Sequence, residues 1–355
     1  MPSDPSAIAP PLTPSPSSPS EPPRPADGRA APPGVPGRPG TGTFTIEGRA
    51  APGLFVVGWL GTIVGLGLIA IAILSGGGVT ATLLLIAALV VLSIGLIAAA
   101  GSQGIERRAR AVQPYRGPSP LLVFAASIPL SILAAIVVAI PLQLLDVPLD
   151  GPVGALGSVI IQALIYVGLV RLLVVDTGAL SWVQMGIVRL APGRAIREMA
   201  AGAVWVVPVI FVTGIVAQLL LQIFPVNPTS PLPPTGTTSG LILSLIAGVL
   251  VAPLGEEILF RGFATTAWVQ GLGRTNGLVL GALFFAFAHV LTVTGTSAGE
   301  AFELAFVAFA GRIPVAFALG WLFLNRGTIW ASFGLHATFN GILLIVAEFA
   351  SRSLG

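Results

Sequence analysis

Apolar runs of about twenty residues alternate with short polar loops from residue 53 to the end of the chain. A helix of that length crosses the hydrocarbon core of a bilayer. The pattern therefore predicts an all-α, polytopic transmembrane bundle with about nine helices, and at least eight. The predicted helices span residues 53–74, 79–100, 121–145, 155–175, 201–224, 241–266, 277–294, 302–324 and 328–350.

Residues 1–48 have a different composition, in which Pro, Ser, Gly and Ala dominate. No apolar run there is long enough to offset the entropy of ordering the chain, which predicts a disordered tail. We expect three regions: the tail over 1–48, four helices with arginine-rich loops over 49–200, and the remaining helices over 201–355.

Composition and charge support an integral membrane protein. Hydrophobic residues make up 54% of the 355 residues and charged residues 9%, and there is no cysteine for a disulfide or a thiolate site. All of the basic residues are arginines, and most lie in alternate loops, which predicts a cytoplasmic N-terminus. The high pI is thus a matter of topology and not of nucleic-acid binding. An arginine-only chain rich in Ala, Gly and Pro suggests a prokaryotic cell membrane.

Arg312 does not fit this topology, because it lies inside the predicted helix 302–324. Either that helix begins later, after an interfacial segment over 298–310, or Arg312 pairs with a carboxylate.

Two adjacent carboxylates, Glu256 and Glu257, follow an apolar run that forms most of a membrane helix. Ionisable groups at such depth are costly and are functional by default. Arg261 lies four residues after Glu257, the favourable order for an ion pair on a helix. We therefore expect a structural pair of Glu257 and Arg261 that orients Glu256.

The two histidines of the chain, His289 and His336, both lie in later apolar runs, and Asn340 shares a helix face with His336. With 1.5 Å of rise per residue, Glu256, His289, His336 and Asn340 all come to lie roughly 12 to 18 Å from the cytoplasmic face. Residues far apart in sequence thus converge on one depth.

The order Glu256-Glu257-x-x-x-Arg261, then Phe285-x-x-x-His289, then His336-x-x-x-Asn340 resembles the CPBP intramembrane proteases. This family includes the type II CAAX prenyl endopeptidases, and the resemblance covers roughly the last third of the chain. It implies that Glu256 and His289 are catalytic and that His336 and Asn340 stabilise the transition state. The residue chemistry agrees, since hydrolysis needs a base for water and donors for the oxyanion.

Alternatives remain open from the sequence. Glu256, His289 and His336 could ligate Zn²⁺, and the family has often been labelled metalloprotease, but the metal-free mechanism is favoured because zinc would occupy the only evident base. Glutamates and histidines in membrane helices also build proton relays, so a proton-coupled transporter or a non-catalytic binding protein is a further alternative. The expected partners are membrane lipids and a peptide or membrane-protein substrate, lipid-modified or not.

Overall fold

The structure, a computed structural model, describes residues 45–110, 114–228 and 232–354, and every regular element in these ranges is a helix. The predicted all-α fold is confirmed, whereas the predicted disorder of residues 1–44 lies outside the described part. The elements are α1 (Pro52–Leu74), α2 (Gly78–Arg110), α3 (Pro120–Leu144), α4 (Pro152–Val170), η1 (Arg171–Val175), α5 (Pro192–Ala203), α6 (Val206–Ile223), α7 (Thr238–Leu245), η2 (Ile246–Val251), α8 (Ala252–Glu256), η3 (Glu257–Thr265), α9 (Thr266–Leu272), α10 (Arg274–Ala288), α11 (Ala298–Arg326) and α12 (Ile329–Leu354).

Eight helical spans in the described ranges are long and apolar enough to cross a membrane, so the chain is an integral membrane protein. The predicted helix 277–294 is the exception, since α10 ends at Ala288 and is shorter than a full span. The backbone N–H of His289 bonds to Ala286 O, three residues back, which tightens the last turn. The residues that follow include the β-branched Val290 and Thr292, which have low helix propensity.

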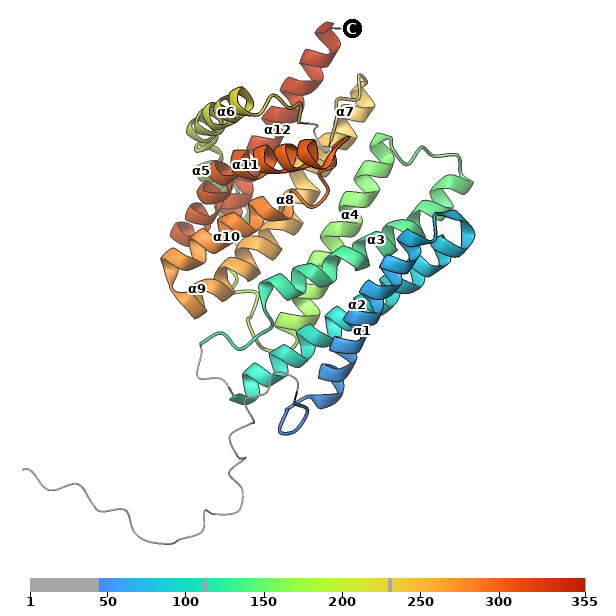
Figure 1. Ribbon diagram of the computed structural model, residues 1–355. Coiled ribbons are helices and arrows are strands. Elements are labelled where there is room, and N and C mark those ends of the chain that lie inside the picture. Colours follow the sequence, from blue (N-terminus) through green and yellow to red (C-terminus); the bar gives the residue numbers. More distant parts are fainter. Residues whose placement is uncertain (1–44, 111–113, 229–231, 355) are drawn as a thin grey trace, which may run out of the picture.

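Helices α1 and α2 form a hairpin that lies along one side of the molecule (Figure 1). Their backbones approach closely because glycines face each other: a Cβ placed on Gly61 would lie 2.7 Å from Gly95 Cα. Small residues at such crossings allow the close helix packing that membrane proteins use. Gly61 and Gly95 therefore serve helix contact.

An aromatic cluster joins the hairpin side of the bundle to the rest. Phe124 of α3 and Phe260 of η3 each lie 5.2 Å, between ring centroids, from Phe284 of α10. Phe260 is also 5.2 Å from Phe285 at an interplanar angle of 90°. Edge-to-face pairs of this kind stabilise beyond their buried area, and they hold η3 rigidly beside α10.

The start of α12 is held by the loop before α5. In that loop Leu180 and Met185 are buried in the core, and the carbonyl of Val188 accepts a hydrogen bond of 3.2 Å from the indole of Trp330. Helix α5 then packs on α12, where a Cβ on Gly334 would overlap the carbonyl oxygen of Met199. These contacts fix the height and rotation of α12.

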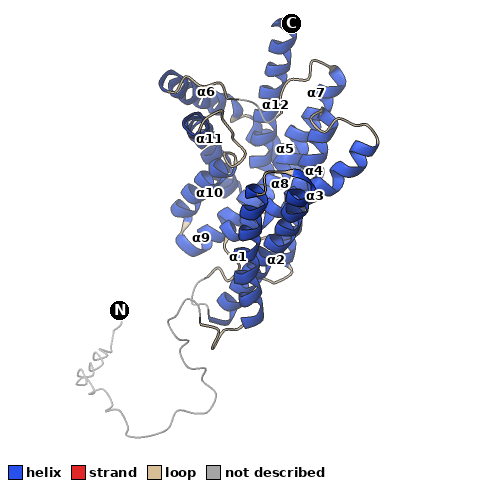
Figure 2. Ribbon diagram, turned by 45° about the vertical axis from the view of Figure 1, so that its right-hand side comes forward, coloured by secondary structure: helices blue, strands red, loops and turns tan. Residues whose placement is uncertain are grey.

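Helix α11 runs without interruption from Ala298 to Arg326 and lies beside α10 (Figures 1 and 2). Arg274 at the start of α10 donates hydrogen bonds to Asn325 Oδ1 and Leu324 O near the end of α11. The two helices are thus antiparallel, with the start of α10 level with the end of α11.

Candidate active site

The two glutamates lie at a change of helix type. The span Thr238–Leu272 alternates α-helical and π-helical segments, with Glu256 ending α8 and Glu257 beginning η3. Pro253 lacks the N–H that an α-helical turn would need, and the N–H of Ala252 bonds to Ala247 O, five residues back. π-Helical turns widen a helix and are frequent at functional sites.

Glu257 is fully buried and has two partners from different elements. Its Oε1 lies 3.1 Å from Arg261 Nη1, and it also lies 2.9 Å from His336 Nδ1 of α12. A buried carboxylate of this kind is stabilised only when it is paired. The expected ion pair with Arg261 is present, and its further contact is to His336.

Glu256 faces both histidines. His289 Nε2 lies 3.7 Å and His336 Nε2 lies 3.6 Å from the same oxygen, Glu256 Oε2. These separations exceed direct hydrogen-bond distance and suit a bridging water or a substrate atom. The structure therefore brings together three of the predicted catalytic side chains, from three separate helices: Glu256 ends α8, His289 caps α10 and His336 lies in α12.

The protonated nitrogens of the two imidazoles follow from their partners. His289 Nδ1 lies 2.7 Å from the carbonyl oxygen of Phe285, which can only accept, so Nδ1–H donates. His336 Nδ1 likewise donates to the Glu257 carboxylate. In the neutral form of each ring, Nε2 is therefore an acceptor, and both lone pairs are directed to the region beside Glu256.

Phe285 organises this region. Its ring lies 4.4 Å from the ring of His289 and 5.6 Å from that of His336, between centroids. The guanidinium carbon of Arg261 lies 3.9 Å from its centroid, a cation–π contact. Phe285 thus packs beside both histidines and shields the buried charges of Arg261 and Glu257.

Asn340 is one turn beyond His336 on α12. Its Nδ2 donates a hydrogen bond of 2.9 Å to Gly248 O in η2, where the π-helical geometry frees a carbonyl. One N–H of the amide remains for another acceptor. Asn340 ties α12 to the same span that carries the glutamates.

The side chains of Glu256 and His289 are partly accessible. The side chain of Glu256 is 15% exposed and that of His289 25% exposed, against 0% for Glu257. Glu256 and His289 are thus accessible to another molecule, whereas the Glu257 carboxylate is enclosed by the protein.

The zinc alternative requires at least three ligand side chains around one point. Among the described residues, no group of three or more His, Cys, Asp or Glu side chains is arranged to hold a metal ion. The metal-free mechanism favoured from the sequence therefore stays a prediction.

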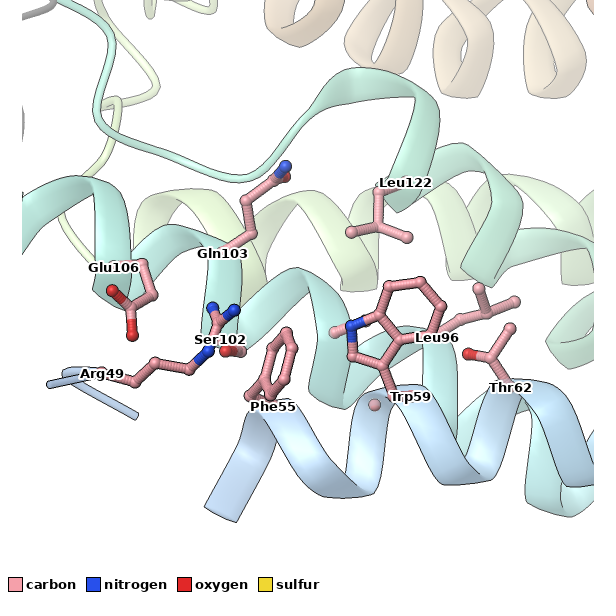
Figure 3. A pocket seen from close by; sticks show the side chains of 11 residues that line it. Arg49, Phe55, Trp59, Thr62, Leu96, Ser102, Gln103, Glu106 and Leu122 are labelled. Carbon is pink, nitrogen blue, oxygen red and sulfur yellow. The ribbon is translucent and has the colours of Figure 1, made fainter. Parts of the chain in front are cut away.

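Figure 3 shows a cavity of about 500 Å³ between α1, α2 and α3, lined by Phe55, Trp59 and Leu96 with Arg49 and Glu106 at one end. None of the predicted site residues lines it. The polar cluster around Glu256 is therefore separate from this cavity.

Residues 238–342 match the family described as Type II CAAX prenyl endopeptidase Rce1-like. This segment of the chain is thus similar to the Rce1-like family. The matched segment contains all six of the predicted site residues: Glu256, Glu257, Arg261, His289, His336 and Asn340. No curated protein and no solved structure matches the chain.

Two features of the segment 238–342 were not visible in the sequence. The first is the hydrogen bond from His336 to Glu257, which joins residues 79 positions apart. The second is the environment of Arg312, which lies inside an unbroken α11 and has no carboxylate within ion-pair distance in the described part of the chain. Neither of the two explanations offered for Arg312 from the sequence applies.

Proposed function

We propose that this protein is an intramembrane endopeptidase that hydrolyses a peptide bond with water activated by Glu256 and His289. The observation that carries the proposal is the approach of two histidine Nε2 atoms to one oxygen of Glu256, at 3.6 and 3.7 Å. Hydrolysis of an amide needs a proton acceptor for the water beside groups that donate to the oxyanion; here Glu256 and His289 would accept, and His336 would donate.

In the first step, a water held between Glu256 and His289 loses a proton to the Glu256 carboxylate. The hydroxide oxygen attacks the carbonyl carbon of the substrate, and the carbonyl oxygen becomes an oxyanion. His289 keeps its Nδ1–H on Phe285 O, so its Nε2 accepts the other O–H of the water and orients it.

His336 and Asn340 stabilise the oxyanion. The second N–H of Asn340 is available, and His336 donates through Nε2 in its imidazolium form, with Nδ1–H on Glu257. Before the attack, the negative charges of Glu256 and Glu257 are then balanced by the positive charges of Arg261 and the His336 imidazolium. Loss of one oxyanion donor typically costs about 10²- to 10³-fold in kcat.

The intermediate collapses with cleavage of the C–N bond. The proton that Glu256 took from water passes to the leaving amine, and His289 relays it. The other product is a carboxylic acid, which ionises. Glu256 is returned to its starting state, and no other reactant is consumed.

The proposed substrate is a peptide or a segment of a membrane protein, with or without a lipid modification, that reaches the site from the cytoplasmic side. The partial exposure of Glu256 and His289 supports access to the cluster. Membrane lipids surround the bundle, and the N-terminus is proposed to be cytoplasmic.

The proposal is tested with the full chain reconstituted in liposomes. A peptide library is incubated with the wild type, Glu256→Gln and His289→Ala, and new termini are identified by mass spectrometry. Glu198→Gln is the matched control, because Glu198 pairs with Arg326 on another part of the bundle. We expect cleavage by wild type and control only; new termini that persist in Glu256→Gln would refute the proposal.

The same liposomes test the transport alternative. A proton-coupled transporter would move protons together with a solute across the bilayer. Proton flux measured with a pH-sensitive dye inside the liposomes, coupled to an added peptide and retained in Glu256→Gln, would favour transport over hydrolysis.

A further inference from the structure

We propose that Arg312 binds a carboxylate of the substrate beside the catalytic cluster and so determines which peptides are cleaved. This inference rests on the proposed protease function. The carboxylate is either the C-terminal group of the peptide or an Asp or Glu side chain.

Arg312 lies at the level of the cluster. The start of α10 and the end of α11 are level, because Arg274 bonds to Asn325. At about 1.5 Å per residue, His289 lies about 22 Å from that end along α10, and Arg312 lies about 21 Å from it along the adjacent, antiparallel α11. His289 and Arg312 therefore lie at about the same depth along the two adjacent helices.

Arg312 also acts electrostatically on the cluster. Its charge interacts with that of Glu256 and with His289. The distance to Glu256 nevertheless exceeds that of an ion pair, since no carboxylate in the described ranges lies within 4 Å of Arg312. The positive charge of Arg312 thus acts on the cluster without a direct ion pair to it.

The guanidinium has spare hydrogen-bond donors. Its hydrogen bond in the structure is from Nη1 to Ala308 O at 3.0 Å, within its own helix. A guanidinium has five N–H donors in a fork that matches a carboxylate. A half-buried arginine in a membrane span is costly to keep unless it has a role.

A carboxylate is the ligand that these features favour. A carboxylate would accept hydrogen bonds from the remaining N–H groups of the guanidinium and neutralise a charge that no carboxylate in the described ranges pairs with. It would also hold the neighbouring peptide bond against Glu256. The positive charge of Arg312 also lowers the repulsion between that carboxylate and Glu256.

The experiment compares three peptide libraries that share their internal sequences. The first library ends in a free carboxylate, and the second ends in a carboxamide. The third also ends in a carboxamide but carries Asp or Glu at each position in turn. KM and kcat are measured for the wild type, Arg312→Gln and Arg312→Lys in liposomes.

The wild type is expected to prefer the first or the third library, which identifies the source of the carboxylate. Arg312→Gln should raise KM for that library about 10- to 100-fold, the loss expected for a charge-assisted bidentate pair. It should leave KM for the carboxamide library unchanged, and any change in kcat that follows from the loss of its charge near Glu256 should be the same for all three libraries. Retained cleavage of the carboxamide library also shows that the variant is folded. Arg312→Lys should recover part of the effect, because lysine keeps the charge but not the fork.

Several results would overturn the inference. An equal loss of kcat/KM on all three libraries would mean that Arg312 serves Glu256 or the fold. A wild type without preference, or an Arg312→Gln variant with unchanged KM throughout, would also exclude carboxylate binding. Failure of the wild type to cleave any library would instead refute the protease function, and the inference would fall with it.

Discussion

Replacement of Glu257 by Gln is expected to destabilise the protein strongly. The side chain is fully buried, and its Oε1 meets both Arg261 and His336. Gln has nearly the same shape but no charge. The substitution therefore leaves Arg261, whose side chain is 2% exposed, without a counter-ion.

The magnitude follows from that burial. Removal of one partner from a buried ion pair costs about 3 to 5 kcal/mol, because the remaining charge is uncompensated. The cation–π contact of Arg261 with Phe285 remains and offsets a small part of this. We expect Glu257→Gln to lower the free energy of unfolding by about 3 to 5 kcal/mol.

A double variant separates stability from activity. Glu257→Gln combined with Arg261→Met removes both charges, and neutral replacements of a buried pair are often tolerated. Most of the lost stability should return. Activity should not return, because the neutral amide of the glutamine does not stabilise the imidazolium form in which His336 donates to the oxyanion. Loss of one such donor typically costs about 10²- to 10³-fold in kcat.

The assay is reversible unfolding of the purified protein in detergent, followed by tryptophan fluorescence, with peptide cleavage measured on the same samples. Stability of Glu257→Gln equal to that of the wild type would show that Arg261 does not depend on this carboxylate. A double variant with full activity would show that Glu257 does not position His336.

Three further predictions concern other parts of the molecule. Glu256→Gln should lower kcat by about 10²- to 10⁴-fold with unchanged stability, and a kcat within threefold of the wild type would exclude Glu256 as the base. Exhaustive chelation should leave cleavage unchanged, whereas metal analysis showing stoichiometric zinc, with loss of activity on its removal, would establish the alternative. Gly334→Ala should destabilise the protein by about 1 to 3 kcal/mol, because the added Cβ meets Met199 O of α5; an unchanged melting temperature would contradict this close packing.

The sequence by itself determined the fold class and the membrane character, because apolar runs of spanning length can satisfy their backbone in a bilayer only as helices. It also identified Glu256, His289, His336 and Asn340 as a candidate set, since polar residues are costly inside such runs. The helix limits were less certain: α10 ends at Ala288, although the apolar run continues to residue 294.

The tertiary structure alone decided which side chains meet. Spacing along one helix predicted the pair of Glu257 and Arg261, but the hydrogen bond to His336 depends on the height and rotation of α12, which α5 and the preceding loop fix. The place of Arg312 depends likewise on the packing of α11 against α10. These contacts join different helices, and the distance between two such side chains depends on how the helices cross. The periodicity of residues along one helix does not determine that crossing.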